Sequence, residues 1–117
     1  MFNFEKLSVY TKAENIYQKL NDQILSNRNI DLSIKNQLKR AALSIVLNIA
    51  EGAGKYSKRD KKNFYTISRG SLQECVAALR ILKIDNKIDE QLFQELYSEF
   101  TEVNKMLSGL IKSMIGK

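Results

Sequence analysis

The sequence predicts an all-α protein, an antiparallel up-down-up-down four-helix bundle. Proline is absent from the 117 residues and only five are glycine, a composition that favours helix throughout. Apolar residues recur at intervals of three and four in four successive segments, which is the period of an amphipathic helix. Because the links between these segments are short, we expect consecutive helices to be antiparallel neighbours within one domain, residues 1–117.

The first helix is expected over residues 5–26. Its apolar stripe consists of Leu7, Tyr10, Ala13, Ile16, Tyr17, Leu20 and Ile24. The run Asn27-Arg28-Asn29 then ends the pattern, because asparagine side chains hydrogen-bond to the local backbone in turns.

The second helix, capped by Asp31 or Ser33 and ending at Glu51 or Gly52, is expected to be the centre of the bundle. Between residues 41 and 50 only two residues are polar. A helix that is apolar on nearly all sides has no face for water and must be enclosed. Ten residues are too few to cross a bilayer, which takes about 20. We therefore expect neighbouring helices to enclose it.

The third helix is expected to open at Ser57, where Ser57-x-x-Asp60 resembles a capping box. Its apolar side consists of Phe64, Ile67, Leu72, Cys75, Val76, Leu79 and Leu82. After a turn at residues 85–87, the fourth helix is expected from Asp89 to Met114. A seven-residue repeat suited to bundle packing runs through Leu92, Leu96, Phe100, Val103, Leu107, Leu110 and Met114, and Phe93, Tyr97, Met106, Ile111 and Ile115 broaden it.

A polar seam follows one side of the second helix, formed by Arg40, Ser44, Asn48 and Glu51 at the spacing of helical turns. Buried polar groups need partners, because an unpaired one costs about 1–3 kcal/mol. The third helix offers Gly70, Ser71 and Glu74.

A hairpin turning at residues 55–56 pairs position i with about 111 − i. This register places Gly70 against Ala41 in a close crossing and Ser44 opposite residues 67–68. It also brings Arg40 beside Ser71, within reach of an ion pair with Glu74. We interpret this seam as structural, because it would fix the alignment of the two helices.

The composition argues against an enzyme. Histidine is absent, which removes the commonest general base and metal ligand. The single Cys75 permits no internal disulfide and lies on an apolar side, so it is interpreted as an inert core residue in a reducing compartment. Glu51 falls opposite Asp60, a pair that could hold a divalent ion, but carboxylates at a hairpin end are more often solvated. No catalytic residue, metal or cofactor is therefore expected.

The chain shows no signal peptide and no apolar run of about 18 residues, so a cytoplasmic protein without membrane contact is expected. Its positive charge is uneven: residues 53–87 hold nine basic and three acidic side chains, equal to the whole net charge of +6. This asymmetry indicates a polyanionic partner or, equally, a solvated face.

Five cations gather at the start of the third helix, where they oppose the helix dipole unless an anion binds there. The candidate nucleic-acid-binding residues are Lys35, Lys39, Lys55, Lys58, Arg59, Lys61, Lys62, Arg69 and Arg80. Tyr56 is a candidate for stacking on an unpaired base, although a tyrosine in a turn is more often packed. We expect binding of RNA or DNA through phosphate contacts. The alternative is a polypeptide partner attracted by the same charges.

One block of the sequence resembles a known family. It runs Arg40-Ala-Ala-x-Ser44-Ile45-x-x-Asn48-Ile49-Ala50-Glu51-Gly52, followed by Phe64 and Gly70-Ser71-x-x-Glu74. This pattern resembles the four-helix-bundle proteins encoded in 23S rRNA intervening sequences, the S23 family. The family often has proline after the Ser-Ile pair, where this chain has Val46, so its second helix is expected to be straighter.

The resemblance implies a non-enzymatic bundle with a basic surface that assembles with itself into a ring, typically a homopentamer. It also implies a fold similar to the accessory variability determinant of diversity-generating retroelements, which partners a reverse transcriptase and binds nucleic acid. Phe93, Tyr97 and Ile111, together with Phe2 and Phe4, are compatible with packing between subunits. A single wider core within one chain explains the fourth-helix residues equally well.

Overall fold

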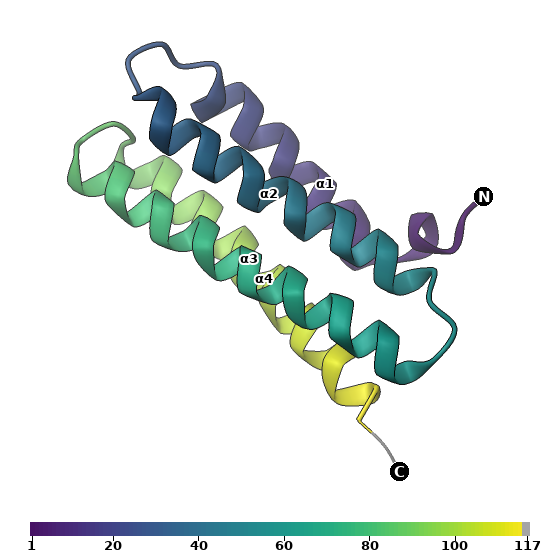
Figure 1. The fold of residues 1–117 in the computed structure, drawn as a ribbon. Helices are drawn as coiled ribbons and strands as arrows, with labels where there is room; N and C mark the ends of the chain where they lie inside the picture. Colours follow the sequence, from purple (N-terminus) through teal and green to yellow (C-terminus); the bar gives the residue numbers. More distant parts are fainter. Residues whose placement is uncertain (116–117) are drawn as a thin grey trace.

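Four long helices pack side by side in the computed structural model, which describes residues 1–115 (Figure 1). The elements are η1 (Asn3–Lys6), α1 (Ser8–Leu20), η2 (Asn21–Leu25), α2 (Leu32–Ala53), α3 (Lys58–Ile84) and α4 (Glu90–Ser113). No strand occurs in this part of the chain, and the all-α prediction is confirmed. None of the described helices is both long and apolar enough to cross a membrane.

The helix predicted over residues 5–26 is interrupted at its start. Leu7 is extended and separates the short 3-10 helix η1 from α1. Phe4 packs edge-on against Tyr10, with ring centroids 4.7 Å apart, which holds η1 against the first turns of α1. At the other end α1 continues into η2, a single π-helical turn that ends at Leu25.

The predicted starts of α3 and α4 are confirmed by their caps. The Ser57 hydroxyl accepts a hydrogen bond from the Asp60 backbone N–H at 3.1 Å, and the Asp89 carboxylate accepts one from the Leu92 N–H at 2.8 Å. The helix α2 ends at Ala53, one residue beyond the predicted Gly52, and the next residue, Gly54, is right-handed at φ −86°. The left-handed residue is Asn86, in the link before α4.

The α2–α3 pair is antiparallel, with a register different from the predicted one. The Ser71 hydroxyl donates to the Ser44 hydroxyl at 2.7 Å, and Lys61 Nζ donates to the Ala53 carbonyl at 3.0 Å. These pairs place position i opposite about 114 − i, a shift of nearly one helical turn. The first turn of α3 extends beyond the end of α2 (Figure 1). The link therefore joins two helix ends that lie at different heights along the bundle.

The predicted close crossing of Gly70 and Ala41 is wrong. A Cβ atom built on Gly70 would meet nothing within 4 Å, whereas one on Gly52 would lie 2.8 Å from Cε1 of Tyr65. Gly52 is therefore the glycine at which α2 and α3 approach most closely. Tyr65 is buried there, while Ile67, predicted for the apolar side, is 48% exposed.

The predicted ion pair between Arg40 and Glu74 is also wrong, since none joins these two exposed residues in the part of the chain that the structure describes. The polar residues between them do find partners. The Asn48 amide donates to the Ser44 carbonyl at 2.8 Å and to its hydroxyl at 3.1 Å. Ser44, Asn48 and Ser71 thus form a half-buried polar cluster between α2 and α3.

The helix α2 is not enclosed on all sides. Val46 is buried, but Leu47 is 60% exposed. In α4, Phe93 and Ile111 are buried in the chain's own core, and Tyr97 is 43% exposed. Phe93 and Ile111 therefore belong to a single wider core and are not available to a second subunit.

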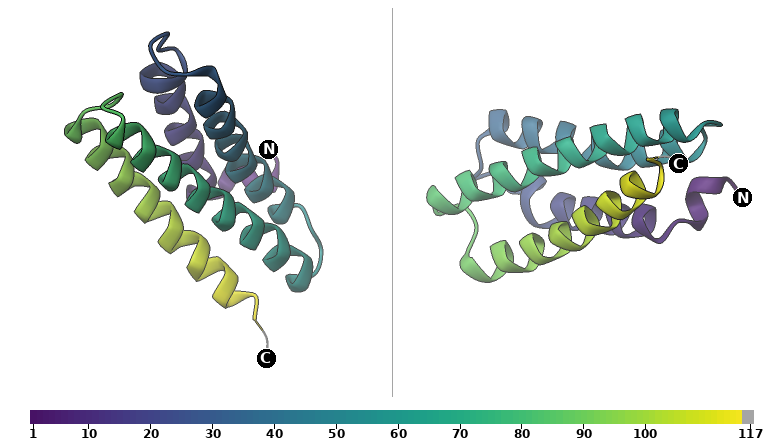
Figure 2. Two further views of the ribbon diagram at one scale, coloured as in Figure 1. Left: turned by 60° about the vertical axis from the view of Figure 1, so that its left-hand side comes forward. Right: turned by 90° about the horizontal axis from the view of Figure 1, so that it is seen from below.

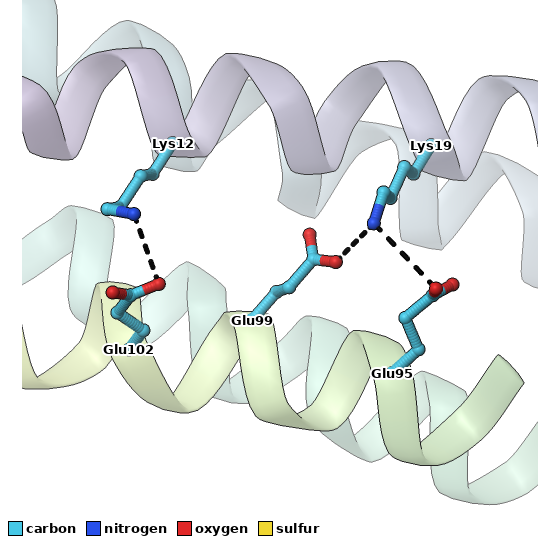
Figure 3. Close-up of polar contacts among 5 residues, drawn as sticks. All are labelled: Lys12, Lys19, Glu95, Glu99 and Glu102. Carbon is cyan, nitrogen blue, oxygen red and sulfur yellow. Dashed lines mark hydrogen bonds and ion pairs between the residues drawn. The ribbon is translucent and has the colours of Figure 1, made fainter. Parts of the chain in front are cut away.

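Ion pairs cross between α1 and α4 (Figure 3). Lys12 pairs with Glu102 at 3.2 Å, and Lys19 pairs with Glu95 at 4.0 Å and hydrogen-bonds to Glu99. The lysine numbers rise as the glutamate numbers fall, so these two helices are antiparallel. The views in Figure 2 show α1 beside α2 and α4 beside α3.

Candidate nucleic-acid interface

The link between α2 and α3 carries a fully exposed aromatic side chain. Tyr56 has a relative exposure of 103%, so its ring contacts none of the core. The alternative that Tyr56 is packed within the chain is therefore wrong. Its ring is available on both faces for stacking.

Three cations that follow Tyr56 in the sequence have no acidic partner in the part of the chain that the structure describes. Lys58, Arg59 and Lys62 form no ion pair within residues 1–115. All three lie in the first turns of α3, where the helix dipole is positive. The cap occupies only part of this terminus, because Ser57 accepts hydrogen bonds from the backbone N–H groups of Asp60 and Lys61. The helix start thus combines a positive dipole with three cations that form no ion pair among the described residues, and Asp60 is the one acidic residue of its first turn.

Two other cations of the predicted cluster stabilise the hairpin itself. Lys55 pairs with Glu51 at 3.0 Å, and its ammonium lies 5.1 Å from the ring centroid of Phe64. Lys61 Nζ donates to the Ala53 carbonyl at 3.0 Å and reaches the Gly52 carbonyl at 3.5 Å, which caps the end of α2. Glu51, considered above as one of two carboxylates at the hairpin end, is thus engaged by Lys55.

The remaining candidates lie away from the link. Lys35 donates to the Asn27 carbonyl at 2.8 Å and, with Lys39, lines a hollow of about 310 Å³ between η2 and α2. Arg69 donates to the Ser108 hydroxyl of α4 at 3.1 Å, and the exposed Arg80 lies three turns further along α3. The structure therefore does not bring the nine predicted cations together. Of the nine, Lys58, Arg59 and Lys62 lie in the first turns of α3, close in sequence to the exposed Tyr56, and form no ion pair within residues 1–115.

Sequence reasoning missed one buried polar contact. The Ser68 hydroxyl is completely buried and donates to the Ile45 carbonyl at 2.9 Å. The signal was present, because Ser68 falls at the core spacing shared by Tyr65, Leu72 and Cys75. Its hydrogen bond helps to fix the register of α3 against α2.

Cys75 is fully buried, and burial raises the pKa of its thiol to about 12, with a smaller contribution from the nearby Glu74 charge. A hollow of about 310 Å³ between α3 and α4 has Tyr97 as its only titratable side chain. It is lined by Leu72, Gln73, Val76, Tyr97, Phe100, Thr101 and Asn104. Neither place combines a nucleophile with a general base.

Comparison with known proteins agrees with this architecture. The family model of the 23S rRNA-intervening sequence protein matches residues 5–109. A comparison with curated proteins gives no match. Among solved structures, the fold is similar to that of a protein of unknown function from the S23 ribosomal protein family of Bacteroides thetaiotaomicron, with 24% identity and a TM-score of 0.83 over 89% of this chain and 98% of that one. The chain therefore belongs to the family of 23S rRNA-intervening sequence proteins.

Proposed function

We propose that this protein binds structured RNA, or another nucleic acid, through the link between α2 and α3. One observation carries the proposal: a fully exposed Tyr56 directly precedes a helix start that holds three cations with no acidic partner in the described residues. Cations concentrated at a helix start are unfavourable without an anion. A nucleic acid supplies phosphate to these cations, and one of its unpaired bases can stack on the exposed ring of Tyr56.

The energetics of such binding follow from the residues. A phosphate near the start of α3 interacts favourably with the helix dipole and with Lys58, Arg59 and Lys62. Stacking of a base on an aromatic ring contributes about 1–3 kcal/mol. Three phosphate contacts per copy give a slope of about −2 to −3 in a plot of log affinity against log salt. Binding of this kind follows the phosphate backbone and reads little sequence.

In this proposal the protein is non-enzymatic and cytoplasmic and acts as an assembly of several copies, with a ring of five expected from the family resemblance. Assembly multiplies the number of links that contact one nucleic acid. The second contact then becomes intramolecular, which raises the overall affinity without any new type of contact.

Filter binding at low salt tests the proposal with a structured RNA and a single-stranded RNA as probes. We expect the variant with Lys58→Glu, Arg59→Glu and Lys62→Glu to lose most affinity for both. The matched control reverses the exposed cations Lys39, Arg80 and Lys87 instead, with the same change in net charge. Equal losses in the two variants would refute the assignment to the link.

A second variant separates stacking from charge. Tyr56→Ala is expected to weaken binding of the single-stranded probe by about tenfold, within the range measured for base stacking. It should leave binding of a fully paired duplex unchanged, because a duplex offers no unstacked base. An absence of binding by the wild-type protein, together with a protein partner that survives nuclease treatment, would favour the polypeptide-binding alternative.

A further inference from the structure

The helix α3 carries a second apolar stripe that faces water. Exposed positions recur at intervals of three and four residues, on the side away from the core. They are Ile67, Gly70, Glu74, Ala77, Ile81 and Ile84, and the three isoleucines are 48%, 48% and 69% exposed. A surface helix of a protein that remains single needs one apolar stripe, so the second requires an explanation.

The adjacent side of α2 continues this surface. Leu47 is 60% exposed, and Leu43, one turn away, is half-buried without packing on the core cluster. Arg40 follows one turn further along the same side. We call this surface the α2–α3 face; its members are Arg40, Leu43, Leu47 and the six α3 residues named above.

Two features of the face remain unexplained within one chain. Gly70 lies in the middle of α3, where glycine is disfavoured relative to alanine, yet no atom would meet a Cβ there. Arg40 and Glu74 are both exposed, and neither forms an ion pair across residues 1–115. The face thus presents a notch, apolar side chains and one charge of each sign.

The register of α2 against α3 shows what would fit this face. Ser44 lies level with Ser71, and Ala53 lies level with Lys61. By the same register Arg40 is level with Glu74. When two copies are related by rotation about an axis parallel to the helices, each residue keeps the same height along that axis in both copies. Placing α2 of one copy against α3 of the next therefore brings level residues together.

We propose that a second copy of this chain covers the α2–α3 face, with α2 of one copy packed against α3 of the next. In this arrangement Arg40 pairs with Glu74 of the next copy. Leu47 packs on Ile67, and Leu43 enters the notch at Gly70. This contact rests on the self-assembly in the proposed function, and it is compatible with a two-fold pair or a larger closed ring.

Charge favours a second copy over another partner. An acidic partner would leave Glu74 without a cation, and a basic partner would leave Arg40 without an anion. A second copy satisfies both charges at once, and like charges brought together across an interface are strongly unfavourable. The face is therefore complementary to itself.

Light scattering over a concentration series, without nucleic acid, tests the contact. We expect wild-type protein to self-associate, and Arg40→Glu or Glu74→Arg alone to weaken association by about tenfold or more. Mixing the two variants should restore association, because each supplies the charge that the other lacks. A contact within one chain cannot be rescued by a second molecule. A wild-type monomer at all concentrations, or a mixture no better than its components, would overturn the proposal.

Glycine substitutions give an independent test with a matched control. Gly109 in α4 is also exposed with no atom near a built Cβ, but it lies outside the α2–α3 face. Gly70→Phe should abolish association and Gly109→Phe should not, while circular dichroism shows both variants folded. Association that survives Gly70→Phe would overturn this inference and leave the RNA proposal standing. If assembly depends on Gly70 but the protein does not bind RNA, the RNA proposal is overturned and this inference stands.

Discussion

Replacing Gly52 by alanine should destabilise the protein, although alanine is the better helix former. A Cβ at this position would lie 2.8 Å from Cε1 and 3.1 Å from Cδ1 of Tyr65, and 3.2 Å from Cβ of Phe64. The shortest of these contacts is about 0.7 Å below the separation of about 3.5 Å at which carbon atoms pack best. Tyr65 is only 2% exposed, so its ring has little room to move.

The magnitude follows from two opposing effects. Overpacking of a core costs about 1–3 kcal/mol. Alanine regains at most about 1 kcal/mol of helix preference, and less in the last turn of α2, where Gly52 lies. We therefore expect Gly52→Ala to lower the free energy of unfolding by about 1–2 kcal/mol. Gly109→Ala, in open space within α4, should raise it by about 0.5–1 kcal/mol.

Urea unfolding followed by far-ultraviolet circular dichroism measures both variants against wild type at one protein concentration. A Gly52→Ala variant as stable as wild type would refute the reasoning, because it would show that α2 and α3 separate there without cost. A similar loss in both variants would show that the Tyr65 contact is not the cause.

Three further predictions concern single contacts. Lys61→Met should lower the free energy of unfolding by about 1 kcal/mol in urea titrations, because it removes the donor to the last carbonyls of α2, whereas Lys62→Met should change it little. The Cys75 thiol should resist iodoacetamide in the native protein at pH 8 and react on unfolding in urea, because burial raises its pKa to about 12; rapid labelling of the folded state would contradict its burial. The hydrogen bond to Glu99 raises the pKa of Lys19 above its usual value, so the stabilisation that this pair provides is complete below that value and lost as pH rises through the raised one. Glu99→Gln should therefore be less stable than wild type near pH 8 and equal to it in strong alkali, as measured by thermal melts across pH.

The helices could be predicted from sequence because their signals are local. The Ser57 and Asp89 caps involve residues three positions away, and the apolar stripes repeat within each segment. The break at Leu7 was missed, because its neighbours fit a helical pattern. Leu7 is not helical, and Phe4 packs on Tyr10 across it, a contact longer than one helical turn.

The candidate site was only partly predictable, because contacts with residues distant in sequence determine which cations are engaged within the fold. Lys58 and Lys61 are indistinguishable as cations in a sequence, yet within residues 1–115 the first has no acidic partner and the second caps the end of α2. Arg69 is likewise engaged within the fold, because it donates a hydrogen bond to the Ser108 hydroxyl of α4. The sequence could identify which residues are basic, but only the neighbouring backbone decides which of them remain available to a ligand.

The sequence by itself determined that this chain forms four helices, where α3 and α4 begin, and that Ser44 and Asn48 lie on one side of α2. The tertiary structure alone decided how far α3 slides along α2, and hence that Gly52 is tightly packed and Gly70 is open. Two apolar stripes bury similar area after sliding by one turn. The choice therefore depends on short-range fit, such as the Ser44–Ser71 hydrogen bond and the Gly52–Tyr65 contact, which no period in the sequence records.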